Sequence, residues 1–181
     1  MISIEAISAR AEGIRRRYGE KDLFRLCGDL GIRVVLHETS LSVAAFKGLS
    51  MVKSRIPVIL LNAKMDEELT RVVLAHEIGH SVLHRDLAAI RGFHDFDLFG
   101  MKDQCEFEAN VFAAELMLDS RDVLEVLNRD VTFFGAAKML RVPPELLDFK
   151  FRVLKHQGYA VIPPMLGNGD FLKRAGRPGR T

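Results

Sequence analysis

The sequence predicts an α+β fold, in which a small, mostly antiparallel three-stranded sheet packs on a helical bundle. Three short strand-like stretches lie within residues 32–61, and apolar residues recur at helical spacing both before and after them. The chain has 181 residues, of which 48% are hydrophobic, and this favours one domain with a sizeable core. We expect that domain to span residues 1–162, with helices over 121–158 as an extension and residues 163–181 as a flexible basic tail.

The first predicted elements are two amphipathic helices. Apolar residues repeat every three or four positions over residues 3–17 and again over residues 21–30. Gly31 then provides a helix-stop signal, because glycine readily adopts the left-handed conformation that ends many helices. These two helices are expected to pack on the core through their apolar faces.

Three strands are predicted next, over Ile32–Leu36, Ser42–Phe46 and Ile56–Leu61. The connections between them are short, which favours antiparallel pairing. Pro57 lies near the start of the third stretch and cannot donate a ladder hydrogen bond, which indicates an edge strand.

The remaining predicted elements are helices. Residues 66–84 form the strongest one, with acidic residues near its start that suit the helix dipole. Residues 85–102 are expected to be mostly loop, and Ser120 is expected to cap a later helix. The helices predicted after the loop cover residues 103–118, residues 121–128 and two stretches that flank Pro143 and Pro144.

Composition excludes several classes of protein. The formal net charge is only +2, which does not suit a general nucleic-acid binder, although four cations in the tail outnumber its one acid. Cys27 and Cys105 are far apart and suggest neither a disulfide scaffold nor a paired-cysteine metal site. The N-terminus lacks the apolar run of a signal peptide, and no apolar stretch reaches the ~18 residues of a membrane span. We therefore expect a soluble, cytoplasmic protein without a membrane partner.

The strongest chemical signal is the run His76-Glu77-Ile78-Gly79-His80 inside the predicted helix. Residues four apart share one helix face, so His76 and His80 can bind a single ion. Glu77 lies about 100° around the helix, beside any water bound to that ion. Zinc lowers the pKa of such a water to about 7, so Glu77 is the candidate general base. The spacing therefore predicts a catalytic zinc site, with manganese as a second possible metal.

A catalytic zinc normally takes three protein ligands, so one more must come from elsewhere in the chain. His84 continues the row from His80, but three ligands in a straight helical row cannot converge on one tetrahedral ion. His84 is therefore expected beside the site or as an alternative ligand. Glu106 and Glu108 are the acidic candidates, and Asn110, four residues after Glu106, suits an amide that orients a ligand histidine. We favour Glu106 and keep Glu108 as an alternative.

Two segments of the chain resemble the ImmA/IrrE family of metallopeptidases. These are LAHEIGHSVLH over residues 74–84 and EFEANVFAAELML over residues 106–118. The order of elements is similar over about residues 5–160, but only the two motifs are specific. Family members often have proline after the Leu-Met pair, where this chain has Asp119 after Leu118.

The resemblance implies a zincin-like fold with a gluzincin-like site. It maps the metal ligands onto His76, His80 and Glu106, with Glu77 catalytic, and it supports Glu106 over Glu108. It also implies an endopeptidase that cleaves a helix-turn-helix transcriptional repressor and so relieves repression. In metallopeptidases of this type an edge strand often binds the substrate backbone as an added strand. Here that strand would supply Val58, Ile59, Leu60 and Leu61, although a buried central strand is the alternative interpretation.

A non-catalytic function is the competing hypothesis, in which the protein binds metal only structurally and regulates through partner or DNA binding by its C-terminal helices. Residues 133–147 have a helix-turn-helix cadence, and the second helix carries Lys150, Arg152 and Lys155. However, Pro144 and Glu145 occupy the positions where base-reading residues usually cluster. We therefore expect these helices to support the catalytic domain and expect no direct DNA binding.

Overall fold

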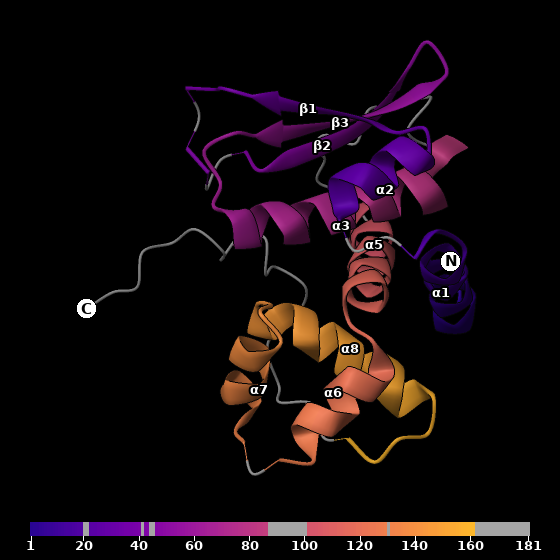
Figure 1. Ribbon diagram of the computed structural model, residues 1–181. Coiled ribbons are helices and arrows are strands. Elements are labelled where there is room, and N and C mark those ends of the chain that lie inside the picture. Colours follow the sequence, from indigo (N-terminus) through magenta and orange to yellow (C-terminus); the bar gives the residue numbers. More distant parts are fainter. Residues whose placement is uncertain (20–21, 41, 44–45, 87–100, 130, 162–181) are drawn as a thin grey trace.

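The computed structural model describes residues 1–19, 22–40, 42–43, 46–86, 101–129 and 131–161. Figure 1 shows a three-stranded sheet with one long helix running beneath it, and a second long helix that leads from there toward the C-terminal helices. The predicted basic tail, residues 163–181, lies outside the described residues, so the division into domain and tail stays a prediction. Among the described residues, none of the helices combines the length and apolar character needed to cross a bilayer.

Most of the described helices begin after a residue whose side chain caps them. Their bounds are α1 Ile4–Tyr18, α2 Leu23–Asp29, α3 Glu67–Leu83, α5 Met101–Met117, α6 Ser120–Leu127, α7 Phe133–Met139 and α8 Pro144–His156. Ser3, Asp22, Asp66 and Thr132 each accept a hydrogen bond from a backbone N–H in the first turn that follows. In contrast, α8 follows Pro143 and has no side-chain cap. Ser120 was expected to cap α6, but it is the first helical residue. The cap is Asp119, which accepts from the Arg121 N–H at 2.8 Å.

The sheet contains β1 Arg33–His37, β2 Gly48–Lys53 and β3 Ile56–Asn62, in the order β1-β3-β2. β2 pairs antiparallel with β3, whereas β1 pairs parallel with it. The expected α+β fold with three strands is therefore confirmed, but the sheet is mixed rather than mostly antiparallel. The reason is that the connection after β1 carries the chain to the far edge of the sheet, so β1 and β2 flank β3.

Two further strand expectations are corrected. The second strand was expected over Ser42–Phe46, but β2 begins at Gly48. Pro57 indicated an edge position, yet β3 is the central strand. A proline is tolerated there because β1 pairs only from Val58 onward, which leaves Pro57 beyond the paired length of β1.

The hydrophobic core is continuous through the described residues and draws on α1, α2, the sheet, α3, α5 and the C-terminal helices. α3 lies between the sheet and α5, and its segment from Val72 to Ser81 is buried on every side. A helix that is buried all round has no need of a polar face, which explains why its apolar residues do not form a single stripe. Polar residues within that segment must therefore find their partners inside the protein.

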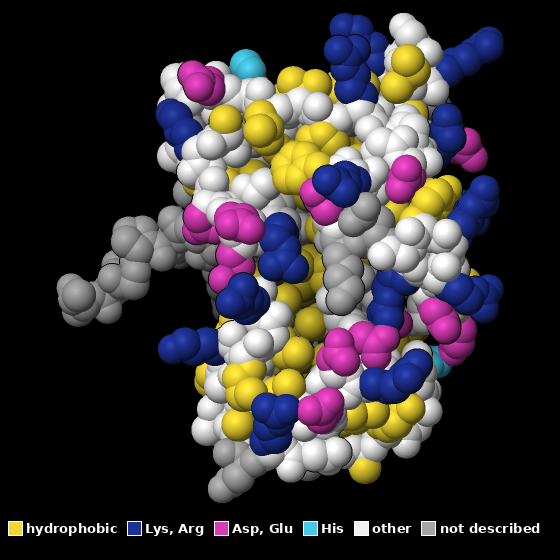
Figure 2. Space-filling view, viewed as in Figure 1, with side chains coloured by type: hydrophobic (Ala, Val, Ile, Leu, Met, Phe, Trp, Pro, Cys, Tyr) yellow, Lys and Arg dark blue, Asp and Glu magenta, His cyan; other side chains and the backbone are white. Residues whose placement is uncertain are grey.

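The C-terminal helices pack against the rest of the chain rather than presenting a basic surface. Lys150 of α8 is fully buried and forms an ion pair with Glu115 of α5. Arg152 pairs with Asp148 one turn earlier in α8. On the face shown in Figure 2, basic and acidic side chains lie interspersed. Of the three α8 cations that suggested DNA reading, only Lys155 is exposed.

Candidate metal centre

The two histidines of the HExxH run lie in the buried part of α3. His76 and His80 are each only 2% exposed, and Glu77 is 6% exposed. Gly79 lets α5 pass very close to this segment, because a Cβ at Gly79 would lie 3.1 Å from the Cα of Ala109. The close crossing brings the first half of α5 beside the two histidines.

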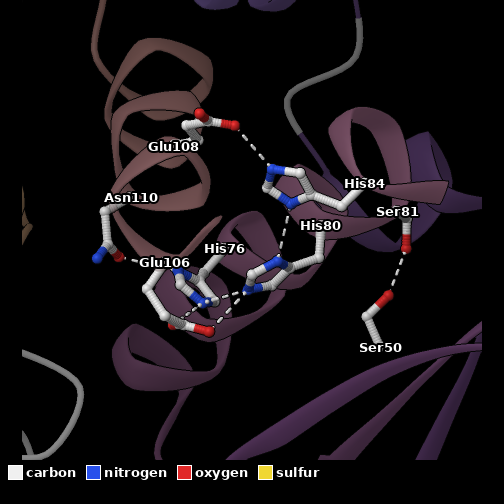
Figure 3. Close-up of polar contacts among 8 residues, drawn as sticks. All are labelled: Ser50, His76, His80, Ser81, His84, Glu106, Glu108 and Asn110. Atoms are coloured by element: carbon white, nitrogen blue, oxygen red, sulfur yellow. Dashed lines mark hydrogen bonds and ion pairs between the residues drawn. The ribbon is translucent and has the colours of Figure 1, made fainter. Parts of the chain in front are cut away.

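α5 contributes Glu106 to the histidine pair (Figure 3). The Nε2 atoms of His76 and His80 are 3.0 Å apart. One carboxylate oxygen of Glu106 is 3.2 Å from His76 Nε2, and the other is 3.4 Å from His80 Nε2. The side chain of Glu106 is 30% exposed, so the cluster is buried on the histidine side and reaches solvent on the glutamate side.

Each histidine uses its other ring nitrogen to contact a buried partner. His76 Nδ1 lies 2.8 Å from Oδ1 of Asn110, one helical turn after Glu106 on α5. An amide oxygen only accepts, so His76 Nδ1 carries the proton and donates it. His80 Nδ1 lies 3.1 Å from Nδ1 of His84, one turn further along α3. The Nδ1 atoms thus face away from the cluster, and the Nε2 atoms face into it.

Charge and burial set the protonation of the cluster. Burial disfavours a charged imidazole, but at His76 the hydrogen bond and negative charge of Glu106 outweigh it and raise the pKa to about 9. At His80 burial prevails, together with the charge of His76, and lowers the pKa to about 4. Burial would raise the pKa of Glu106, but its contacts with His76 and His80 hold it well below its usual range. The negative charge of Glu106 therefore attracts a cation to this point, and a bound metal would displace the proton that His76 holds on Nε2.

The donor set fits a zinc ion. His76, His80 and Glu106 each offer one ligand atom, and these atoms all lie within 4.8 Å of one another. Three ligands at about 2.0–2.1 Å from a tetrahedral zinc would be about 3.3 Å apart. The two Nε2 atoms are 3.0 Å apart, and each lies 3.2 or 3.4 Å from a different oxygen of Glu106, so these contacts are close to that value. Two imidazoles and one carboxylate also leave a fourth direction for water, as in catalytic zinc sites.

Comparison with known proteins identifies the family of this chain. Residues 27–152 match the peptidase family described as "IrrE N-terminal-like domain". The chain belongs to this peptidase family. The resemblance drawn from the two motifs is thereby confirmed. A relative in Bacillus phage phi105, named "Uncharacterized immunity region protein 2", is 29% identical over 147 residues, which cover 80% of this chain and 88% of the relative.

The other polar residues that the sequence predicts near the metal centre lie around the cluster and not in it. Glu108, the alternative ligand, points away from Glu106 and lies 3.0 Å from His84 Nε2 (Figure 3). His84 therefore contacts His80 on one side and Glu108 on the other. The structure brings Glu106 and not Glu108 into the histidine cluster, and it places Asn110 against His76 as the helical spacing predicted.

The sheet order contradicts the expected edge position of the stretch Val58–Leu61. Val58–Leu61 pairs with β1 on one side and with β2 on the other, so its backbone groups are already committed on both edges. An added strand needs a free edge. The residues Val58, Ile59, Leu60 and Leu61 thus form the centre of the sheet, which is the alternative interpretation of this stretch.

Sequence reasoning missed the approach of β2 to Glu77. A Cβ at Gly48 would lie 2.9 Å from Glu77 Oε1 and 2.7 Å from Val73 Cγ1, so only glycine lets the strand come this close. Ser50, two residues along β2, shares a buried hydrogen bond of 2.8 Å with Ser81 of α3. Gly48, the first residue of β2, was the available signal, because glycine in a strand often marks a close approach of another backbone or side chain.

Proposed function

We propose that this protein is a zinc-dependent endopeptidase whose metal is held by His76, His80 and Glu106. The observation that carries the proposal is the convergence of these side chains: one ligand atom from each lies within 4.8 Å of the others, and the two Nε2 atoms are 3.0 Å apart, near the spacing of a tetrahedral zinc site. Membership of a peptidase family supports the same reaction class. Manganese accepts the same nitrogen and oxygen donors, so metal content is part of the test.

Glu77 is the proposed general base. It follows the ligand His76 in α3, and its carboxylate lies beside Gly48 of β2. Zinc, when bound, would polarise the scissile carbonyl and make a water acidic enough to lose a proton at neutral pH. Glu77 would take that proton on its carboxylate and later deliver it to the leaving amine. Burial of the surrounding α3 segment keeps bulk water from competing for the proton.

β2 is the proposed binding edge for the substrate backbone. It is an outer strand in the order β1-β3-β2, and among the described strands it pairs only with β3. An extended peptide that added to β2 would pass Gly48 and hence the carboxylate of Glu77. The hydrogen bond between Ser50 and Ser81 ties this strand to the metal helix and so keeps the edge at a constant distance from it.

A helix-turn-helix transcriptional repressor is the proposed substrate. The relative in phage phi105 is named as an immunity region protein, and this name supports a role in which cleavage relieves repression. The alternative, a non-catalytic regulator that binds DNA or a partner through the C-terminal helices, is opposed by the buried ion pair of Lys150. We therefore propose that α6, α7 and α8 support the catalytic domain.

The test uses the full chain and the helix-turn-helix repressor encoded nearest to it. Glu77→Gln should retain bound zinc, measured by mass spectrometry of the metal, and should lose cleavage, measured by gel electrophoresis and peptide mapping. Glu67→Gln is a matched control, because Glu67 is an exposed glutamate in the same helix. Cleavage by Glu77→Gln at the rate of the control would refute the mechanism. DNA affinity that survives zinc removal and weakens with salt would favour the regulator.

A further inference from the structure

A buried polar chain runs from His80 away from the proposed metal position (Figure 3). His80 Nδ1 lies 3.1 Å from His84 Nδ1, and His84 Nε2 lies 3.0 Å from Glu108 Oε2. His84 is 4% exposed and Glu108 is 3% exposed. Because water has little access to these atoms, the protons on each ring must be matched by acceptors within the protein.

The far end of the chain determines where the protons lie. The second oxygen of Glu108 accepts hydrogen bonds from the backbone N–H of Ile2 and from the side-chain amide of Gln104, each at 2.8 Å. Two N–H donors on one oxygen favour the ionised form of Glu108, and an ionised carboxylate only accepts hydrogen bonds. His84 Nε2 must therefore carry a proton and donate it to Glu108.

The proton on His84 Nε2 sets the state of His80. A neutral His84 protonated at Nε2 offers a lone pair at Nδ1, which can accept only from a protonated Nδ1 of His80. His80 then presents a lone pair at Nε2, the atom that faces His76 and Glu106. This is the tautomer that an imidazole needs in order to bind a metal through Nε2.

We propose that His84 and Glu108 are positioning residues that hold His80 in its metal-binding tautomer and strengthen it as a donor. The proposal rests on the proposed metal site and adds a pair of residues outside the HExxH and Glu106 set. The two ligand histidines differ in the partner of their Nδ1 atoms. His76 donates to the neutral amide of Asn110, whereas His80 is linked through His84 to the carboxylate of Glu108. Removing the link should therefore weaken metal binding through His80.

Zinc affinity is the first measurement, made on the full chain by competition with a chelator of known affinity. His84→Leu removes the acceptor for His80, and loss of such a partner typically weakens metal binding about 10–100-fold. His84→Asn places an amide oxygen near the former Nδ1 but cannot reach Glu108, so its affinity should lie between those of the wild type and His84→Leu. Glu108→Gln removes the charge and should also give an intermediate affinity.

Two variants serve as matched controls. His37→Leu makes the same change at an exposed histidine of β1, and Glu125→Gln makes the same change at an exposed glutamate of α6. Both should bind zinc as the wild type does. Thermal unfolding of every variant without metal identifies any that fail to fold, and His84→Asn retains a polar group if His84→Leu is too disruptive.

The second measurement separates positioning from a purely structural tether between α3 and α5. In the zinc-loaded protein labelled with ¹⁵N-histidine, the Nδ1 proton of His80 should give a signal protected from solvent exchange. The signal should persist in His84→Asn, shift in Glu108→Gln and be lost in His84→Leu. If His84 and Glu108 only tethered α3 to α5, the substitutions would lower the unfolding temperature but would not change the His80 signal in this pattern.

The outcomes distinguish this inference from the proposed function. A wild-type chain that binds no zinc would overturn the proposed metal site itself. Wild-type zinc binding together with unchanged affinity and an unchanged His80 signal in folded His84→Leu would overturn only the role of His84. Unchanged affinity in Glu108→Gln would remove the carboxylate from the proposal.

Discussion

Replacing Gly79 by alanine tests whether the close crossing of α3 and α5 is required by the fold. Alanine is more favourable than glycine inside a helix by about 1 kcal/mol. At Gly79, however, the added methyl would lie 3.1 Å from both Cα and O of Ala109 and 3.3 Å from Cδ1 of Phe112. Carbon atoms in good contact are about 3.5–4.0 Å apart, so the methyl overlaps backbone that can yield only if α5 moves.

The magnitude follows from the two opposing terms. Overpacking a dense core costs about 1–3 kcal/mol, and subtracting the helix-propensity gain leaves a net destabilisation of about 1 kcal/mol for Gly79→Ala. For a chain of this size the unfolding temperature should fall by about 2–4 °C. Ala109 lies between Glu106 and Asn110 on α5, so the same displacement should also weaken zinc binding.

Gly13→Ala is the matched control. Gly13 lies inside α1, and a Cβ there would meet nothing within 4 Å. This variant should therefore gain up to about 1 kcal/mol of stability and leave zinc affinity unchanged. Urea unfolding of the metal-free proteins, followed by circular dichroism, measures the free energy of unfolding of both variants, and competition with a chelator measures their zinc affinity. The close-crossing argument is refuted if Gly79→Ala stabilises the protein as much as Gly13→Ala does.

Three other predictions concern protons, burial and the strand beside the base. Zinc binding at pH 6 should release about one proton, because His76 with a pKa of about 9 is protonated before the metal binds. Calorimetry in buffers of different ionisation enthalpy measures that number. Lys150→Met should destabilise the protein by about 3–5 kcal/mol in urea unfolding, because it leaves the Glu115 carboxylate buried without its partner. Gly48→Ala should lower the cleavage rate by at least about ten-fold, because the new methyl displaces Glu77, while zinc affinity is retained.

Each of these predictions has a result that contradicts it. Zinc-binding heats that do not depend on the buffer would show that His76 is neutral before binding. If the double variant Lys150→Met with Glu115→Gln is no more stable than Lys150→Met, the loss comes from packing and not from an unpaired charge. Equal cleavage rates for Gly48→Ala and the wild type would mean that Glu77 tolerates displacement or has another role.

Much of the candidate site could be predicted because its residues fall in two short segments, each within one helix. Residues four apart on a helix share a face, and this places His76 near His80 and Glu106 near Asn110 wherever the two helices lie. The same periodicity separates Glu106 from Glu108. The class of fold was also predictable, since the periodicity of apolar residues distinguishes helix from strand.

The order of the strands could not be predicted in the same way. Short connections favour antiparallel pairing, but the pairing depends on where the chain crosses the sheet, and sequence spacing does not encode this. Pro57 indicates an edge strand, yet it is accommodated in the central strand β3 because β1 begins pairing only at Val58. In the tertiary structure the outer strands are β1 and β2, and we propose that β2, which lies beside Glu77, binds the substrate instead of β3.

The sequence by itself determined the ligand types, their helical spacing and the resemblance to a peptidase family. Only the tertiary structure decided which atoms are in contact. α5 packs against Gly79, Glu106 contacts the two histidines of the HExxH run, and Glu108 contacts His84. The physical reason is that helical periodicity fixes directions within one element, whereas contacts between elements depend on how closely their backbones can approach. At Gly79 the close approach of α5 depends on the absence of a side chain. The sequence shows that a glycine is there, but only the structure shows which helix needs the space.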